Sequence, residues 1–158
     1  MKVVIDTREQ KPFTFLQCGM DIETAAGTLP IGDYSIAGLE NHIAVERKSL
    51  PDLVQCLGRE RERFAREMMR AAALESFAVV IEAPWQALAE GKYKGNLNPG
   101  AACASVAAFT ARHRIPFFFA GTRGMAERFT AVFLRQYLKG KEHELQAVNA
   151  ALQAGKGQ

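Results

Sequence analysis

The residues with the clearest chemical potential in this sequence are Asp33, Glu46 and Lys48. A pair of carboxylates can bind Mg²⁺ or Mn²⁺, because these hard cations prefer oxygen ligands. Such a cation lowers the pKa of a bound water and stabilises negative charge on a phosphate. A neighbouring ammonium group can orient the attacking water or offset the developing charge. Together, the three side chains would suit hydrolysis of a phosphodiester bond.

These three residues fall in a segment whose pattern predicts a β-hairpin. Apolar runs at 32–36 and 43–48 flank a polar turn, Ala37-Gly38-Leu39-Glu40-Asn41. Residues two apart in a strand point to the same face, so Glu46 and Lys48 can converge while Arg47 points away. The register of the hairpin decides whether Asp33 joins them. Short charged triplets are common, so a solvated hairpin end explains the spacing alone equally well.

The same segment resembles the signature of the XPF-type nuclease family, a Gly-Asp…Glu-Arg-Lys-x-x-x-Asp pattern. The matching residues are Gly32-Asp33-Tyr34, Val45-Glu46-Arg47-Lys48-Ser49 and Asp52-Leu53. Upstream, Val4-Ile5-Asp6-Thr7-Arg8-Glu9 is similar to the family's opening strand, an apolar run that ends in Asp-x-Arg-Glu. These elements occur in the family's order, and several elements at compatible spacing are more specific than any one alone.

The resemblance implies a fold, an activity and a set of site residues. The fold would be α/β and restriction-endonuclease-like, with a mixed central sheet flanked by helices in a single domain. The activity would be metal-dependent endonucleolytic cleavage of DNA, at branched or flapped structures, with Mg²⁺ or Mn²⁺ as cofactor. The implied catalytic residues are Asp6, Arg8, Asp33, Glu46 and Lys48, and the implied metal ligands are Asp33, Glu46 and Asp6.

Several of these residues also have a simpler structural interpretation. Asp6 and Arg8 are close enough in sequence to pair with each other or to cap a turn. Ser49 is a candidate helix N-cap, and Asp52 three residues on is its capping partner, an interpretation we favour over a chemical role. The functional alternative for the whole chain is a catalytically silent DNA-binding or scaffolding module of the same fold. Such silent members usually lack acidic or lysine positions that this chain retains.

Basic residues in three places are candidates for contact with DNA. Arg47 and Arg8 would hold phosphate or support the carboxylates. Arg63 belongs to a set of arginines that share one face of a predicted helix at 59–74, although such a run is usually a solvated face. Lys92 and Lys94 flank Tyr93 in a flexible loop, where lysines suit phosphates and a tyrosine can stack on a base. The same composition also suits an ordinary connector.

The remaining pattern predicts alternating strands and helices. Strands are expected at 2–6, 77–82 and 116–120, and helices at 50–57, 98–113 and from 122 to Gly140. The aromatic stripe of that last helix predicts core packing, with homodimer formation as a second interpretation. Residues 1–140 would form the nuclease domain, and 141–158 a polar tail or one more short helix. No tandem helix-hairpin-helix or helicase domain follows, which predicts a stand-alone nuclease domain with a separate DNA-binding or helicase partner.

Composition favours one globular domain. The 158 residues are 48% hydrophobic and 23% charged, with a net charge of +3. No apolar run approaches the roughly 20 residues of a membrane span, so no membrane partner is expected. Three scattered cysteines argue against a disulfide framework and a zinc site. We therefore expect a reducing, cytoplasmic location near the nucleoid, and the small size would fit a phage protein acting in the host cytoplasm.

Overall fold

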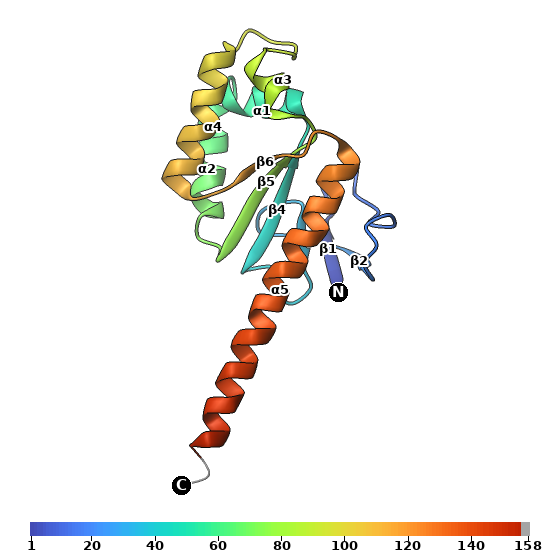
Figure 1. Cartoon of the computed structure of the whole chain (residues 1–158). Helices are drawn as coiled ribbons and strands as arrows, with labels where there is room; N and C mark the ends of the chain where they lie inside the picture. Colours follow the sequence, from blue (N-terminus) through green and yellow to red (C-terminus); the bar gives the residue numbers. More distant parts are fainter. Residues whose placement is uncertain (156–158) are drawn as a thin grey trace.

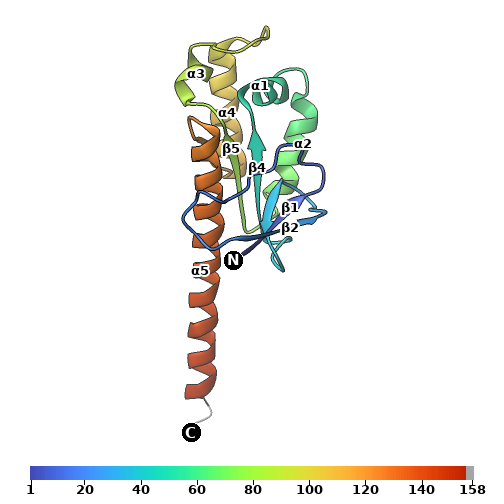
Figure 2. The same cartoon turned by 90° about the vertical axis from the view of Figure 1, so that its right-hand side faces the viewer.

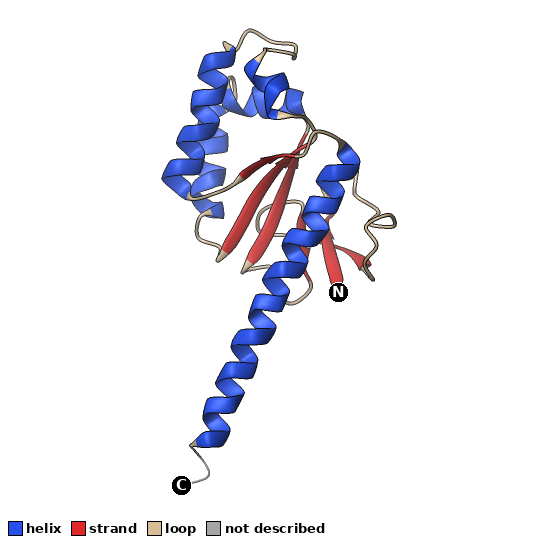
Figure 3. Cartoon of the chain, viewed as in Figure 1, coloured by secondary structure: helices blue, strands red, loops and turns tan. Residues whose placement is uncertain are grey.

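A computed structural model of the chain describes residues 1–155. Its centre is a six-stranded sheet with the strand order β2-β1-β3-β4-β5-β6 (Figure 3). The strands are β1 (Lys2–Asp6), β2 (Glu23–Gly27), β3 (Tyr34–Ile36), β4 (Ile43–Lys48), β5 (Ser76–Ile81) and β6 (Phe117–Phe119). The helices are α1 (Leu50–Leu57), α2 (Arg61–Ala71), α3 (Trp85–Ala89), α4 (Pro99–His113) and α5 (Arg123–Ala154).

The strand directions bring functional segments to one edge of the sheet. β1 runs parallel to β2, and β4, β5 and β6 are parallel to one another. β3 is antiparallel to both β1 and β4, so it alone runs in the opposite direction. The carboxyl ends of β1, β4 and β5 therefore meet the beginning of β3. This mixed sheet between helices confirms the predicted fold class, and the predicted hairpin is formed by β3 and β4.

Helices cover the two faces of the sheet unequally. α1, α2 and α4 pack on one face, and α5 crosses the other (Figures 1 and 2). Along β4, Ala44 belongs to the core under α1 and α2, whereas Ile43 and Val45 belong to the core under α5. Because side chains alternate along a strand, Glu46 and Lys48 point toward the α1 and α2 layer. Arg47 points toward α5.

Two predicted helix starts are confirmed by their caps. The Ser49 hydroxyl accepts a hydrogen bond from the Asp52 amide at 3.3 Å and donates one to the Asp52 carboxylate at 2.6 Å. The Asn98 side chain accepts from the Ala101 amide at 3.1 Å. These bonds satisfy amides that have no partner inside the helix. Asp52 therefore has the capping role that we favoured.

The prediction that the last helix ends at Gly140 is wrong. α5 continues without interruption from Arg123 to Ala154, so residues 141–154 are its second half and project away from the sheet (Figure 1). A glycine inside a helix costs only about 1 kcal/mol, which does not end a helix by itself. Lys141 also pairs with Glu75 at 2.5 Å, which holds α5 beyond Gly140. Despite its length, neither α5 nor any other helix in residues 1–155 is apolar enough to span a membrane.

Two large aromatic side chains remain partly exposed. The strand predicted at 116–120 is β6, the edge strand, and Phe118 is 39% exposed while stacking on Phe129. Trp85 begins α3 with 44% of its surface exposed. Its indole packs edge-on against Phe119, with ring centroids 5.0 Å apart. Apolar residue type predicts burial poorly at a sheet edge, because one side of the strand has no neighbour.

Candidate active site

Asp33 is held in place by its own backbone and by its neighbours. Its carbonyl accepts from the Asp6 amide, and its amide donates to the Val45 carbonyl, both at 2.8 Å. Its carboxylate accepts from the Arg47 amide at 2.7 Å. Gly32 precedes it with φ +80°, and a Cβ there would lie 2.9 Å from the Cβ of Ala44. The turn into β3 therefore requires a glycine, which explains the Gly-Asp pair in physical terms.

Glu46 and Lys48 join Asp33 at the end of the hairpin. Tyr34 pairs with Val45, so the next position along each strand brings Asp33 beside Glu46. Glu46 is 7% exposed, and its Oε1 lies 2.5 Å from the Nζ of Lys48. The ammonium group also lies 5.9 Å from the centre of the Phe64 ring on α2. The structure thus brings together the three residues from which the sequence argument started.

The electrostatics of this group are dominated by burial and by the proximity of two carboxylates. Burial and the charge of Glu46 raise the pKa of Asp33 to about 8. Burial also raises the pKa of Glu46, and the neighbouring Lys48 opposes that shift. Burial disfavours charge on Lys48, but the carboxylate of Glu46 outweighs it and raises the pKa of the ammonium. Two buried acids that repel each other form a site that a cation would stabilise.

The donor set fits a hard divalent cation that keeps most of its own water. Asp33 and Glu46 supply carboxylate oxygens at one place, and within residues 1–155 no cluster of three acidic, histidine or cysteine side chains is formed. Mg²⁺ is commonly bound through one or two carboxylates together with water and substrate phosphates. The pair therefore suits Mg²⁺ or Mn²⁺ better than a metal that requires a complete protein cage.

Asp6 pairs with Arg8, which is the simpler of the two interpretations that its position in the sequence allowed. Its Oδ1 accepts from the amide and Nε of Arg8, at 2.9 and 2.6 Å. Its Oδ2 accepts from Nη2 of Arg8 at 3.0 Å and from the Leu29 amide at 2.7 Å. The hydrogen bonds from Arg8 lower its pKa to about 2, against the effect of burial. Because both oxygens are already used, we exclude Asp6 from the candidate metal pair and assign it a structural role.

Arg8 remains well placed for an anionic ligand. Its side chain is 69% exposed although it is bonded to Asp6, and it also donates to the Leu29 carbonyl at 2.9 Å. The acids Asp33 and Glu46 are close enough to raise its pKa further, after the larger effect of Asp6. A guanidinium that is anchored on one edge and open on another suits contact with a phosphate.

Arg47 is buried in an ion-pair chain on the opposite face of the sheet. It donates to both oxygens of Glu9, each at 2.8 Å, and lies 3.3 Å from Glu82. Glu82 in turn pairs with Arg123 at the start of α5, at 2.7 Å. The Arg47 side chain is only 12% exposed. The prediction that Arg47 contacts DNA is therefore corrected: its side chain supports Glu9 and Glu82, and its amide supports Asp33.

The sequence analysis did not find the residues that join Arg47 in this series of ion pairs. Glu82 ends the strand predicted at 77–82, and Arg123 lies at the start of the helix predicted from residue 122, and neither position indicates a partner. Their pairing depends on the packing of α5 beside β4 and β5, which brings together residues 41 positions apart. No local pattern carries that information.

The other predicted DNA contacts lie on the surface. Arg63 is 65% exposed and pairs with Glu60, and Lys92 pairs with Glu90 at 2.5 Å. Lys94 forms no ion pair within residues 1–155. The Tyr93 hydroxyl donates to the Leu97 carbonyl at 2.9 Å, and its ring packs against the core. Tyr93 therefore supports its own loop, and the lysines remain candidates for phosphate contact.

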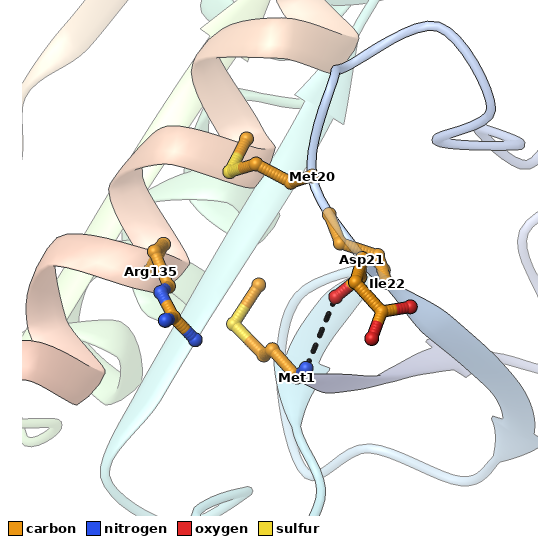
Figure 4. A pocket seen from close by; sticks show the side chains of 5 residues that line it. All are labelled: Met1, Met20, Asp21, Ile22 and Arg135. Atoms are coloured by element: carbon orange, nitrogen blue, oxygen red, sulfur yellow. Dashed lines mark hydrogen bonds between the residues drawn. The ribbon is translucent and has the colours of Figure 1, made fainter.

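A separate hollow lies at the other end of the sheet (Figure 4). It has a volume of about 300 Å³ and lies where α5 approaches the start of β1. The N-terminal amine donates to the Asp21 carbonyl at its wall, at 3.1 Å. Its lining is formed by Met1, Met20, Asp21, Ile22 and Arg135. It contains no pair of acids, and it is separated from Asp33 by the length of β1, so it is not the candidate active site.

The fold and the site define the chain as a nuclease-type α/β domain with an acidic pair and a lysine at one edge of its sheet. A family model of the ERCC4 domain matches residues 5–133, so the chain belongs to the ERCC4 domain family. No protein of curated function matches the sequence significantly.

Two solved structures share the fold. XPF from Aeropyrum pernix has a TM-score of 0.65 and 22% identity, over 86% of this chain and 59% of that one. XPF from Aeropyrum pernix in complex with DNA has a TM-score of 0.61 and 21% identity, over 89% of this chain and 66% of that one. This chain therefore spans less than two thirds of either relative. At this identity the likeness establishes the fold, and it agrees with the family assignment.

Proposed function

We propose that this protein is a divalent-metal-dependent endonuclease that hydrolyses phosphodiester bonds in DNA. The observation that carries the proposal is the convergence of Asp33, Glu46 and Lys48 at the end of the β3–β4 hairpin, in a member of a nuclease family. The charge of Glu46 raises the pKa of Asp33, and a positive ion between the two acids would remove that cost. This is the arrangement expected of a site that is completed by a cation and its substrate.

Each residue has a role that follows from its position. Asp33 and Glu46 would hold Mg²⁺ or Mn²⁺, which when bound supplies an acidified water and stabilises charge on the phosphate. Lys48, which is held by Glu46, would orient a water molecule and offset negative charge near the phosphate. Arg8 would bind a phosphate oxygen with its exposed edge.

DNA with branches or flaps is the proposed substrate. This part of the proposal is supported by the resemblance to XPF-type nucleases and by the fold shared with an archaeal XPF that was solved in complex with DNA. The exposed basic residues Arg8, Arg63, Lys92 and Lys94 lie outside the acidic pair and could neutralise phosphates on a longer substrate. A separate DNA-binding or helicase protein remains a proposed partner.

The test is cleavage of a labelled panel that contains single strand, duplex, 3′ flap, fork and four-way junction. Each substrate is incubated with Mg²⁺, Mn²⁺ or chelator. We expect metal-dependent cutting of the branched substrates by the wild type, and losses of at least about a hundredfold in Asp33→Asn and Lys48→Met. Arg112→Gln removes an exposed charge on α4, away from the site, and should cut like the wild type.

The outcomes separate an enzyme from a silent module. Wild-type protein that binds these DNAs but leaves all of them intact with either metal would favour the catalytically silent binding module. Cutting that is unchanged in Asp33→Asn would show that the hairpin end is not the active site. Circular dichroism of each variant establishes that the fold has been retained.

A further inference from the structure

A surface groove runs beside α1 and α2 and is not part of the acidic pair. Its first half has a volume of about 580 Å³ and lies between α1 and the loop 94–97. Its second half, of about 620 Å³, continues along the start of α2 past Arg63 and Arg66. Gly58 and Arg59 line both halves, so the two hollows form one continuous trough.

The rim of this trough carries unbalanced positive charge. Within residues 1–155, Arg59, Arg66 and Lys94 form no ion pair. The trough is lined by two acids, Glu60 and Glu62, against the basic residues Arg59, Arg61, Arg63, Arg66 and Lys94. The carboxylate of Glu60 already pairs with Arg63 and accepts from Gln55 at 2.5 Å. Cations without protein partners along one groove favour a ligand with repeated negative charges.

The floor of the first half is apolar. Val54 is 5% exposed, and Leu97 packs on the same core from the opposite wall. Gly95 crosses between them with φ +133°, and a Cβ there would lie 3.8 Å from Val54. A duplex keeps the faces of its bases stacked inside the helix, whereas an unpaired strand presents both phosphates and the faces of its bases. An apolar floor with a basic rim therefore fits a single strand.

The trough and the candidate active site share two helices. α1 begins at Leu50, directly after Lys48 and Ser49. Arg63 on α2 lines the trough, and the next residue, Phe64, is buried with its ring centre 5.9 Å from the Lys48 ammonium. A strand that lies past Lys94, Arg59 and Arg63 would thus lie against the two helices that cover Lys48 and Glu46.

We propose that this trough binds a single-stranded arm of the DNA substrate as it leaves the site of cleavage. The inference rests on the proposed nuclease function for its biological meaning, because the site of cleavage is itself a proposal. The binding of a single strand, however, can be measured without any cleavage. The trough would make the preferred substrate one that carries an unpaired arm next to the reacting phosphate.

The experiment is fluorescence anisotropy with labelled oligothymidine and a duplex of equal length, in the presence of chelator so that no cutting occurs. We expect Arg59→Gln/Lys94→Gln to weaken single-strand binding by about tenfold or more at moderate salt. It should also reduce the slope of log affinity against log salt by about 1.4, at about 0.7 for each lost contact. Duplex affinity should change by less than about threefold, because a duplex does not enter the trough.

The matched control is Arg112→Gln/Lys139→Gln, which removes one arginine and one lysine from exposed positions outside the trough. It should bind the single strand like the wild type. The proposal is overturned if the wild type does not bind the single strand, if the trough variant binds it normally, or if single strand and duplex weaken equally. If the trough variant loses binding to oligouridine RNA but keeps binding to oligothymidine, the trough is assigned to RNA.

Failure of this inference can be distinguished from failure of the nuclease proposal. If the wild type cuts flaps but the trough variant retains single-strand binding, the nuclease proposal stands and the trough proposal falls. If the trough variant loses single-strand binding but the wild type never cuts, the trough is a strand-binding site in a silent module.

Discussion

The chemistry of the candidate site depends most on the protonation of Asp33. Its pKa of about 8 in the folded protein lies far above the ordinary value of 3.8, first because of burial and then because of Glu46. Between these two values the folded state binds more protons than the unfolded state. The contribution of Asp33 to stability is therefore greatest at low pH and is lost as pH rises toward 8. One proton accounts for at most about 1.4 kcal/mol per pH unit.

We therefore predict that the metal-free protein loses unfolding free energy as pH rises from about 5 to about 8. Asp33→Asn should flatten this dependence, because the amide has the same shape and does not titrate. Urea denaturation at several pH values, in chelator, measures the slope. Asp21→Asn removes an exposed carboxyl at the far end of β1 and should retain the wild-type slope. Equal slopes for Asp33→Asn and the wild type would contradict the proposed proton on Asp33.

Gly32 offers a second test at the residue scale, of the close packing between the turn and β4. Both Gly32 and Gly38 have positive φ, +80° and +86°, but only Gly32 is crowded by Ala44 and Val45. Gly38→Ala should cost about 1–2 kcal/mol for the left-handed backbone alone. Gly32→Ala should cost about 1–3 kcal/mol more, because the new methyl group must displace β4. Thermal or urea unfolding of the two variants compares them directly. Equal losses of unfolding free energy would show that Gly32 is not required for the close approach of the turn to β4.

At the residue scale, the sequence predicted which chemical groups form the site better than it predicted the hydrogen-bond and ion-pair partners of each group. The three groups of the site follow from the period-2 alternation of a strand and from the hairpin register, both of which are local. Asp6 shows the limit of this reasoning. Its spacing from Arg8 allowed two roles, and only the turn that brings the Leu29 amide to its second oxygen decides between them.

At the scale of elements, the ion-pair chain through Arg47 connects the β3–β4 hairpin to α5. Arg47→Leu would leave Glu9 and Glu82 without their shared partner, and Glu9 is only 3% exposed. Breaking a buried pair in this way typically costs about 3–5 kcal/mol. We predict a loss of that size in urea denaturation. Arg63→Leu, at an exposed pair, should cost less than about 1 kcal/mol.

The same pair of variants tests the corrected role of Arg47. DNA affinity per folded molecule should weaken more in Arg63→Leu than in Arg47→Leu, because only Arg63 is open to solvent. If Arg47→Leu keeps its full stability and loses DNA affinity, then Arg47 contacts phosphate and the structural role assigned here is wrong.

Most elements of the fold were predictable because their signals are local. Ser49 and Asn98 mark helix starts with their caps, and the continuous apolar run of β5 marks a central strand. The end of α5 was not predictable from Gly140, because helix propensity is weak compared with a tertiary contact such as Lys141 with Glu75. The position of β6 at the sheet edge depends on strand order, which no single segment contains.

At the scale of the whole molecule, exposed apolar residues gather where β6 and the first half of α5 meet. Phe118, Met125 and Val132 are 39%, 52% and 41% exposed, and Phe129 lies against Phe118 between them. Met125, Phe129 and Val132 share one helix face by their spacing. A patch of this kind on the surface favours a protein interface, and a homodimer through it remains our prediction.

Sedimentation velocity over a range of micromolar concentrations tests this prediction. The wild type should shift from monomer to dimer, and Val132→Glu should remain monomeric, because a charge would be buried in the interface. Leu152→Glu changes a still more exposed apolar residue in the projecting half of α5 and should dimerise normally. A wild type that is monomeric throughout, or dissociation caused only by Leu152→Glu, would contradict an interface at β6 and α5.

The central claim for the whole protein is that Asp33 and Glu46 form a divalent-cation site at the end of the hairpin. Titration of the metal-free protein with Mn²⁺, followed by calorimetry, tests this claim without knowledge of the right DNA substrate. We predict binding that weakens by more than about tenfold in Asp33→Asn and in Glu46→Gln, and that is unchanged in Asp52→Asn, whose carboxylate caps α1. A wild type that does not bind Mn²⁺, or binding that Asp33→Asn leaves intact, would contradict the account.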